Sequence, residues 1–466
     1  MAAPEARCLS ARELAHDVLD RAPGRGQPPT RHLDELLPKS GLSPAERGHA
    51  TELVHGVIRR EHTLDMLLRQ HVRRPLRQVE SGALNWLRLA TWELLFSHTA
   101  PPYAILNETA EAVKRSGNPQ WTGFINGVLR AISRDLTPDF TDQPGPSAVP
   151  CETGRYRLLN SPVFPDPASD PRGYFRDAFS YPDWLIERWV TRFSRETLWQ
   201  IGFWFNAAPI PTLRVNTLLS TRESLLEKLT AAGFEALAGR HPHAIHLTRT
   251  ARIAELPGFE EGLFAVQDES AMEAATLLAP TGEERILDLC AAPGGKTMHM
   301  AALLQNRGQI VAVDVDPHRL KLIEDSSRRL HVTNVKCELV PRDSARLPKG
   351  PFDAVLLDVP CSNTGVLGKR PEVRWRLTPA DLTELAEIQS RLLQAALGAV
   401  RIGGRVLYST CSVEPEENEQ LVRSVMEDYP GFEIVAERKH VPSQPADGGY
   451  QALLRSTSGG PVGVET

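Results

Sequence analysis

Two cysteines follow apolar, strand-length segments in the last third of the chain. Cys361 stands in DVPCSNTG and Cys411 stands in YSTCSVEPEEN. Ligand-facing residues of an open α/β sheet lie at the carboxyl ends of its strands, so we expect both thiols at one edge of a sheet. A buried cysteine is usually only a small apolar residue. Two of them at neighbouring strand ends, one behind Asp358 and a proline, instead favour nucleophilic chemistry.

The reaction that suits such a pair is methylation of a pyrimidine carbon. C5 of cytosine is a poor nucleophile, but a thiolate that adds to C6 makes C5 enamine-like and able to attack a methyl sulfonium. A neighbouring acid favours this adduct by hydrogen bonding to the N3/N4 edge, and loss of the C5 proton then releases the thiol. The target base must be unpaired or extruded, because C6 is inaccessible in a stacked helix. These residues alone leave open which cysteine is the nucleophile.

A loop with the sequence AAPGGKT follows the expected strand 286–290 and precedes a helix. Its glycines, Gly294 and Gly295, allow a ligand to approach the backbone closely. The loop is not a P-loop, because Cys290 stands where GxxxxGK[ST] requires its first glycine, and GxGxxG is also absent. An ordinary tight turn between strand and helix is the alternative interpretation.

An acid at the end of the next expected strand favours a nucleoside ligand. Asp314 comes 26 positions after Asp288 (314 − 288), and an acid in this place commonly accepts hydrogen bonds from ribose hydroxyls. An adenosine-bearing ligand without a pyrophosphate fits the combination, so the predicted cofactor is S-adenosylmethionine. Asp343, after the third strand, either faces the adenine or caps a turn.

Alternating strand-length and helical segments predict the scaffold that holds these residues. RILDLC, QIVAVDVD, NVKCELV, FDAVLLDV and GRVLYSTC are typical of a doubly wound parallel sheet. The catalytic domain is assigned to residues 276–466, after a small α+β domain over residues 175–275. Residues 137–174, rich in proline, serine and aspartate, predict a linker with little buried surface. Residues 1–136 have helical apolar spacing and predict an all-helical bundle.

Composition excludes several classes of protein. The 466 residues are 41% hydrophobic and 24% charged, which permits two to four folded domains. No apolar run approaches the roughly 18 residues of a membrane span, and a secretory signal is not expected. The six cysteines lack CxxC or zinc spacing, so we expect no disulfide framework, no metal and a reducing cytosol. The net charge of −5 neither supports nor excludes RNA, because local patches decide affinity.

The motifs also resemble a known family. LDLCAAPGGKT, AVDVD, LLDVPCSNTGVLGKRPEVRW and YSTCSVEPEENE resemble the signatures of RNA cytosine-C5 methyltransferases. ILNETAEAVKR and GFINGVLRAI resemble a NusB-type domain, and this pairing, with ELPGFEEGLFAVQDESA, is similar to the RsmB (Sun/Fmu) family. The resemblance covers nearly the whole chain apart from the proline-rich segment. It implies a multidomain α and α/β fold with an N-terminal NusB-like RNA-binding domain, a small α+β domain and a C-terminal Rossmann-like class I methyltransferase domain.

The resemblance also implies roles for single residues. Cys411 is implied to be the nucleophile, Cys361 to assist product release, and Asp358 to lie at the edge of the catalytic site. The implied reaction is methyl transfer to C5 of cytosine 967 of 16S ribosomal RNA by a monomeric cytoplasmic enzyme without a metal. The usual glycine before the third-strand acid is replaced by Arg342. The implied S-adenosylmethionine contacts are Cys290, Ala291, Ala292, Pro293, Gly294, Gly295, Lys296, Asp314, Asp343 and Asp358.

Basic residues suggest where RNA would bind, although a solvated surface is the alternative for each of them. Phosphate contacts are expected near the catalytic loop and in the helical domain, with Trp375 stacking on a base. The candidates are Lys369, Arg370, Arg374 and Arg376, and Arg59, Arg60, Arg69, Arg73, Arg74 and Arg77. Two other functions compete with the leading one: the same chemistry on transfer RNA or 23S rRNA, and a non-catalytic ribosome-assembly factor with a relic methyltransferase fold. The complete motifs speak against the latter.

Overall fold

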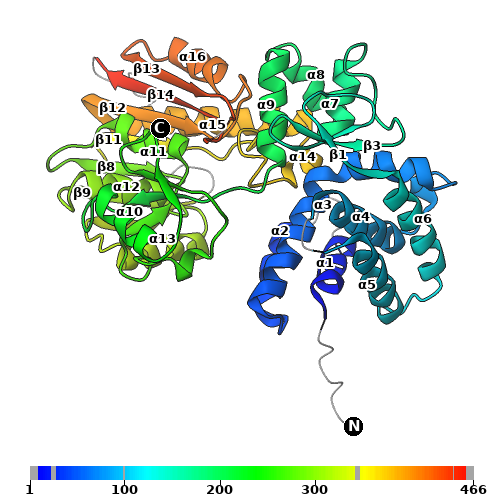
Figure 1. Cartoon of the computed structure of the whole chain (residues 1–466). Helices are drawn as coiled ribbons and strands as arrows, with labels where there is room; N and C mark the ends of the chain where they lie inside the picture. Colours follow the sequence, from blue (N-terminus) through cyan, green and yellow to red (C-terminus); the bar gives the residue numbers. More distant parts are fainter. Residues whose placement is uncertain (1–8, 22–27, 98–99, 342–346, 444, 458–466) are drawn as a thin grey trace, which may run out of the picture. The chain divides into compact units, whose positions relative to one another are not determined.

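The computed structural model of the chain describes residues 9–21, 28–97, 100–341, 347–443 and 445–457. The chain forms two compact units (Figure 1). The first consists of residues 1–207 and the segment Leu367–Arg376, and the second consists of residues 208–366 and 377–466. No helix in the described part of the chain is both long and apolar enough to cross a membrane.

The helices at the start of the first unit bury the apolar residues that the sequence pattern identifies, which confirms the all-helical prediction for this region. A glycine allows two of them to pack very closely: a Cβ atom at Gly56 would lie 2.2 Å from the side chain of Trp92. The elements are α1 (Ala11–Asp20), α2 (Pro29–Leu36), η1 (Leu37–Lys39), α3 (Pro44–His71), η2 (Leu76–Gln78), α4 (Ser81–Phe96), α5 (Pro102–Arg115) and α6 (Trp121–Asp135).

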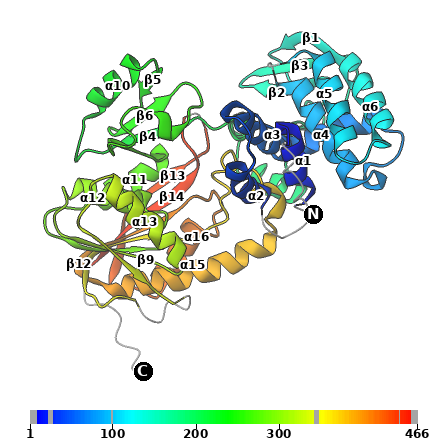
Figure 2. The same cartoon turned by 90° about the horizontal axis from the view of Figure 1, so that it is seen from below.

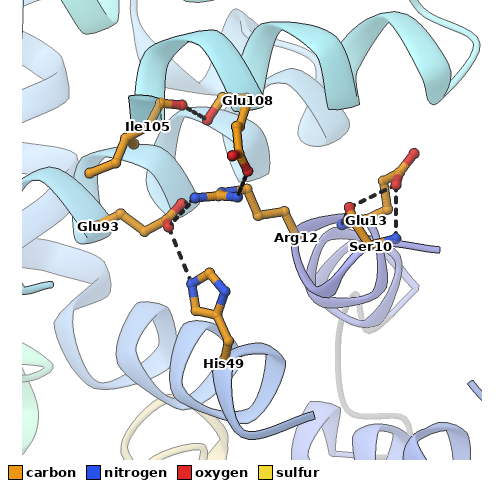
Figure 3. A network of polar contacts seen from close by, with 8 residues as sticks. Ser10, Arg12, Glu13, His49, Glu93, Ile105 and Glu108 are labelled. Carbon is orange, nitrogen blue, oxygen red and sulfur yellow. Dashed lines mark hydrogen bonds and ion pairs between the residues drawn. The ribbon is translucent and has the colours of Figure 1, made fainter. Parts of the chain in front are cut away.

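A polar network joins four of these helices (Figure 3). Arg12 of α1 donates two hydrogen bonds to Glu93 of α4, at 2.8 and 2.7 Å, and a third to Glu108 of α5. His49 of α3 contacts the same Glu93 carboxylate at 3.2 Å. Burial opposes ionisation of Glu93, but the bonds from His49 and Arg12 outweigh it and lower the pKa of Glu93. The buried carboxylate of Glu93 is therefore charged, and its hydrogen bonds link α4 to α1 and α3.

The predicted linker is wrong, because most of residues 137–174 fold. They form an antiparallel sheet in the order β1-β3-β2, with β1 (Leu136–Thr141), β2 (Ala148–Glu152) and β3 (Arg155–Leu159). Val149, Tyr156 and Tyr174 are almost fully buried. The composition of this segment predicted a linker because prolines are rare in β-strands. Pro150 is tolerated because β2 is an edge strand, where a missing N–H costs little.

The next helices lie in the first compact unit, although the sequence assigns the residues from 175 onwards to the small α+β domain. They are α7 (Pro171–Phe179), α8 (Asp183–Trp189) and α9 (Arg195–Asn206). Their aromatic side chains form one cluster: Phe175 stacks on Phe179 and Tyr181, and Phe179 meets Phe203 edge-on. The short helix α14 (Val373–Arg376) lies in the same unit.

The second unit begins with a small α+β fold. Its antiparallel sheet has the order β5-β6-β4-β7 and packs with α10 around Leu213, Leu225, Ile245 and Phe264. Its elements are β4 (Thr212–Val215), α10 (Arg222–Ala231), β5 (Ala236–Ala238), β6 (Ala244–Leu247), η3 (Ile253–Glu255) and β7 (Phe264–Val266).

A seven-stranded sheet completes the second unit, in the order β10-β9-β8-β11-β12-β14-β13. The first five strands in this order are parallel, and β14 and β13 run antiparallel to their neighbours. The strands are β8 (Arg285–Leu289), β9 (Gln309–Asp314), β10 (Val335–Leu339), β11 (Phe352–Asp358), β12 (Val400–Thr410), β13 (Phe432–His440) and β14 (Gly449–Ser456).

Helices cover both faces of this sheet (Figure 2). Alternate residues of the central strands point to opposite sides, so Ile286 packs in the core under α11–α13 and Leu287 in the core under α15 and α16. The chain winds outwards from β8 to β10 and then returns to β11 beside β8, which places a switch point between β8 and β11. The helices are α11 (Glu269–Leu278), α12 (Gly295–Leu303), α13 (Pro317–Arg329), α15 (Pro379–Ala399) and α16 (Glu419–Glu427).

Candidate active site

The structure brings the two cysteines together at the carboxyl edge of the large sheet. β11 and β12 are adjacent, with Asp358 paired with Ser409, so the loops that follow them are neighbours. The Sγ atoms of Cys361 and Cys411 are 3.0 Å apart, and both cysteines are free. Strand pairing alone therefore places two thiols side by side although 50 residues separate them.

Hydrogen bonding distinguishes the two thiols. Cys411 Sγ lies 3.3 Å from Asn363 Oδ1, and Asn363 Nδ2 donates to the Cys361 carbonyl at 2.8 Å. Asn363 has a φ of 61°, a left-handed conformation that asparagine tolerates better than most residues. The hydrogen bond with Cys411, together with burial, raises the pKa of Cys361 well above its ordinary value. Cys361 is therefore a protonated thiol at neutral pH.

A buried carboxyl group lies beneath both cysteine loops. Glu417 is fully buried and accepts the backbone N–H of Ser362 at 2.8 Å and the side-chain amide of Gln389 at 2.9 Å. The hydroxyls of Ser362 and Ser412 also donate to it. Burial outweighs these bonds and raises the pKa of Glu417. Glu417 is not among the site residues predicted from the sequence, where its only signal is an acid six positions after Cys411 (417 − 411).

Close backbone contacts lock the same loops. Gly365 N–H donates to the Cys411 carbonyl at 3.0 Å. A Cβ atom at Gly365 would lie 2.8 Å from that oxygen and 2.5 Å from the carbonyl of Gly448, so only glycine fits there. Thr364 Oγ1 accepts the Val413 N–H at 3.0 Å. The relative position of the two sulfur atoms is therefore set by the packing of both loops.

The AAPGGKT loop lies at the switch point beside these cysteines. Ala292 N–H donates to Asp314 Oδ2 at 3.3 Å, and Asp316 N–H donates to Asp314 Oδ1 at 3.1 Å. Gly294 has a φ of 98°, which favours glycine, and a Cβ there would lie 3.2 Å from Ile323. Burial, with the nearby charges of Asp314 and Asp358, raises the pKa of Cys290 to about 12. Cys290 is thus a neutral thiol and not a second nucleophile.

A lysine joins the AAPGGKT loop to the loop of Cys361. Lys296 Nζ lies 2.7 Å from Asp358 Oδ2. Burial acts to lower the pKa of Lys296, but the charge of Asp358 outweighs it, with smaller contributions from Cys411 and Asp288, so the pKa is raised. Asp288, fully buried, accepts the Thr297 hydroxyl at 2.6 Å, and burial raises its pKa to about 7. Lys296 therefore places a positive charge beside the Cys411 sulfur.

The residues of this loop fit the cofactor predicted from the sequence. Asp314 is almost fully buried at the end of β9, where an acid can accept ribose hydroxyls. Its neighbours Gly294 and Gly295 keep the start of α12 clear of side chains: only Gln267 lies within 4 Å of a Cβ built at Gly295, and at 3.9 Å. Asp343, the remaining predicted cofactor residue, lies outside the described residues.

Three of the arginines predicted to contact RNA are unsuited to it, because they are buried within the first unit, and Trp375 is half-buried there. Arg374 is 1% exposed and donates to the carbonyls of Arg59 and Phe205 at 3.0 and 2.8 Å. Trp375 Nε1 donates to the Ile58 carbonyl at 2.9 Å. Arg59 and Arg60 are also buried. Sequence spacing could not separate these from the exposed candidates, which are Lys369, Arg370, Arg376, Arg69, Arg73, Arg74 and Arg77.

Comparison with known proteins agrees with this architecture. A model of the 16S rRNA methyltransferase RsmB/F matches residues 275–455, a NusB family model matches residues 9–134, and an RsmF/B-like ferredoxin-like domain matches residues 181–254. A solved methyltransferase homolog protein from Pyrococcus horikoshii is 28% identical, with a TM-score of 0.54 over 60% of this chain and 97% of that chain.

Two curated relatives extend over almost the whole chain. The probable ribosomal RNA small subunit methyltransferase B of Bacillus subtilis is 30% identical over 426 residues, which is 91% of this chain and 90% of that protein. Ribosomal RNA small subunit methyltransferase B of Klebsiella pneumoniae is 32% identical over 452 residues, 96% of this chain and 95% of that protein. The chain therefore belongs to the RsmB family of RNA methyltransferases.

Proposed function

We propose that this protein transfers a methyl group from S-adenosylmethionine to C5 of a cytosine in 16S ribosomal RNA, at position 967. The observation that carries the proposal is the pair of thiols, Cys361 and Cys411, 3.0 Å apart beside the AAPGGKT loop. Methylation of oxygen or of an exocyclic nitrogen needs no thiol, whereas methylation of a pyrimidine C5 needs a nucleophile at C6. The names of the curated relatives support the choice of the small-subunit RNA.

Cys411 is proposed to form the bond to the base. Its sulfur interacts electrostatically with the Lys296 ammonium and lies 3.0 Å from the protonated Cys361 thiol, which can donate a hydrogen bond to it. The thiolate adds to C6, and the ring electron pair moves to C5. Asp358, which lies 2.7 Å from Lys296, is proposed to hold the N3/N4 edge of the cytosine.

The second half of the reaction restores the aromatic ring. S-adenosylmethionine, which the 290–296 loop and Asp314 would hold, would supply a methyl group on a positively charged sulfur, and breaking of its S–CH₃ bond would leave the neutral thioether S-adenosylhomocysteine. After C5 has taken this methyl group, the C5 proton leaves to solvent, the electron pair of the C5–H bond re-forms the C5–C6 double bond, and the C6–sulfur bond breaks with its electron pair going to the Cys411 sulfur. Cys361 assists this release, because its S–H can donate to the Cys411 sulfur as negative charge returns to it.

Bisulfite sequencing of total RNA from cells with and without the gene tests the whole proposal. Loss of one 16S mark at position 967 is the expected result. A mark lost instead from transfer RNA or 23S rRNA would keep the chemistry and refute the substrate. If no mark is lost, and the purified protein also fails to label naked or assembling 16S RNA with radioactive S-adenosylmethionine, the enzymatic proposal is refuted in favour of a non-catalytic assembly factor.

A further inference from the structure

Three histidines meet in the second unit, and the proposed methyl transfer uses none of them. His241 and His243 lie in the turn between β5 and β6, and His299 lies on α12. His241 and His299 are almost fully buried. His243 Nδ1 is 3.0 Å from His299 Nε2. One ring nitrogen from each residue can be chosen such that all three lie within 4.8 Å of one another.

The rings are arranged with nearly threefold symmetry. The ring centroids are 5.2, 5.3 and 5.7 Å apart, and the three interplanar angles are 73°, 70° and 73°. In a tetrahedral zinc site the metal–nitrogen distance is about 2.0–2.1 Å, which puts each ring centre roughly 3.2 Å from the ion and separates the centres by roughly 5.2 Å. The observed separations equal or slightly exceed this value. The hydrogen bond between His243 and His299 explains why those two rings are close, but it does not explain why the third ring lies at a similar distance from both.

We propose that His241, His243 and His299 form a mononuclear site for a divalent first-row transition ion of the zinc class, with water in the fourth position. Neutral imidazole is a preferred ligand of such ions. Burial lowers the pKa of all three histidines, with the charges of Arg214 and Arg222 contributing for His241 and His243.

The surroundings limit how tightly an ion binds. Arg214 and Arg222 are positively charged neighbours of the rings and oppose a cation. Glu269, the nearby acid, is engaged by His246 and by the backbone N–H of Arg240, both at 2.8 Å. His243 N–H also donates to His241 Nδ1 at 3.1 Å, and coordination through Nε2 of His241 moves its proton to Nδ1 and breaks this bond. We therefore expect a moderate affinity with one ion per chain.

The position of the histidines indicates what the ion would do. His299 comes three positions after Lys296 (299 − 296) on the helix that begins at the AAPGGKT loop. His241 and His243 belong to the small α+β sheet. An ion would therefore cross-link the small sheet to the cofactor helix, where Arg214 of β4 already donates to the Gly295 carbonyl at 2.5 Å. The proposed role is structural support of the cofactor loop.

Cobalt titration of the untagged, chelator-treated full chain tests the site. The background protein carries Cys361→Ala and Cys411→Ala, because the paired thiols would otherwise compete for the ion. We expect one equivalent of Co²⁺ to give the visible absorption of a four- or five-coordinate ion, without a thiolate charge-transfer band, and Zn²⁺ to displace it. His243→Ala, at a half-buried position, should weaken Co²⁺ binding at least tenfold.

Two further variants make the result specific. His241→Gln should weaken binding as His243→Ala does, with an unchanged far-ultraviolet circular dichroism spectrum. His318→Gln, which removes an exposed histidine of α13, should leave binding unchanged. Failure of the background protein to take up stoichiometric Co²⁺, or equal binding by the His243→Ala variant, would overturn the proposal and leave a hydrogen-bonded histidine cluster. Because the experiment measures metal binding, it can refute the metal site without bearing on whether the protein methylates 16S RNA.

Discussion

The buried carboxyl group of Glu417 accepts the backbone N–H of Ser362 at 2.8 Å, although the two residues are 55 positions apart. Ser362 directly follows Cys361, and Glu417 also accepts the hydroxyl of Ser412, which directly follows Cys411. One acidic side chain thus binds the residue that follows each of the two cysteines. The hydrogen-bond partners of the Glu417 carboxyl group are Ser362, Ser412 and Gln389 rather than either sulfur atom, so Glu417 acts as a positioning residue.

Replacement of Glu417 by glutamine should slow methyl transfer without weakening cofactor binding. The amide offers one acceptor oxygen in place of two and turns an NH₂ group towards the donors that the carboxylate accepts. We expect kcat to fall by about 10²-fold, as for other small displacements of reacting groups, and KM for S-adenosylmethionine to change little. Glu427→Gln, at the exposed end of α16, is the control. An equal rise in KM with unchanged kcat would contradict a positioning role.

The two cysteines should give opposite results when each is replaced by alanine. Cys411→Ala removes the proposed nucleophile and should abolish both methylation and any covalent RNA complex. Cys361→Ala leaves the nucleophile but removes the donor that assists its departure, so a complex stable in denaturing gels should accumulate. A Cys411→Ala protein that still methylates RNA would refute the assignment.

Arg374→Ala should destabilise the first unit. The guanidinium group donates to the carbonyls of Arg59 and Phe205 and lies 4.4 Å from the ring centroid of Tyr181. Its removal leaves buried carbonyls without a donor, and we expect a loss of about 3 kcal/mol in the free energy of unfolding. Urea denaturation of the full chain, followed by tryptophan fluorescence, measures this loss. The matched variant Arg376→Ala, two positions on and exposed, should change stability by less than about 0.5 kcal/mol.

Asp288 should make stability depend on pH. Its folded pKa of about 7 lies above the unfolded value of about 3.9, so between these values the folded chain holds a proton that the unfolded chain has lost. The stabilising contribution is complete below about pH 4 and is lost as pH rises through about 7. Between pH 5 and pH 8, wild type should lose about 2–3 kcal/mol relative to Asp288→Asn. Urea titrations that show the same pH slope for both proteins would contradict this.

Arg73→Glu combined with Arg74→Glu should weaken RNA binding while leaving S-adenosylmethionine binding intact. Both side chains are exposed just after α3. The loss of two phosphate contacts should make the slope of log K for RNA association against log salt concentration shallower by about two. Filter binding at several salt concentrations measures this effect. The paired substitution to lysine keeps both charges and is the control. Unchanged RNA affinity in the glutamate variant would refute the contact.

Much of the site's placement follows from local sequence pattern. Apolar runs alternating with helical segments predict a parallel sheet, and in such a sheet Cys361, Cys411 and the 290–296 loop reach one edge because every parallel strand ends there. The order β10-β9-β8-β11-β12 brings them together as this argument requires. The linker prediction failed because residues 137–174 lack such a local pattern. Prolines interrupt their apolar residues, and only the pairing of β1, β3 and β2 in the folded sheet brings these residues together.

The sequence by itself predicted the chemistry, because thiols after consecutive strands and the AAPGGKT loop favour pyrimidine C5 methylation through residue type and order. Only the tertiary structure decided which polar residues are available to act. Arg374 is buried and donates to backbone carbonyls, and Glu417 lies beneath both cysteine loops. His241, His243 and His299 come together from a turn and a distant helix. The physical reason is that burial, hydrogen bonding and charge depend on neighbours in space, and these neighbours lie tens to hundreds of residues away in the chain.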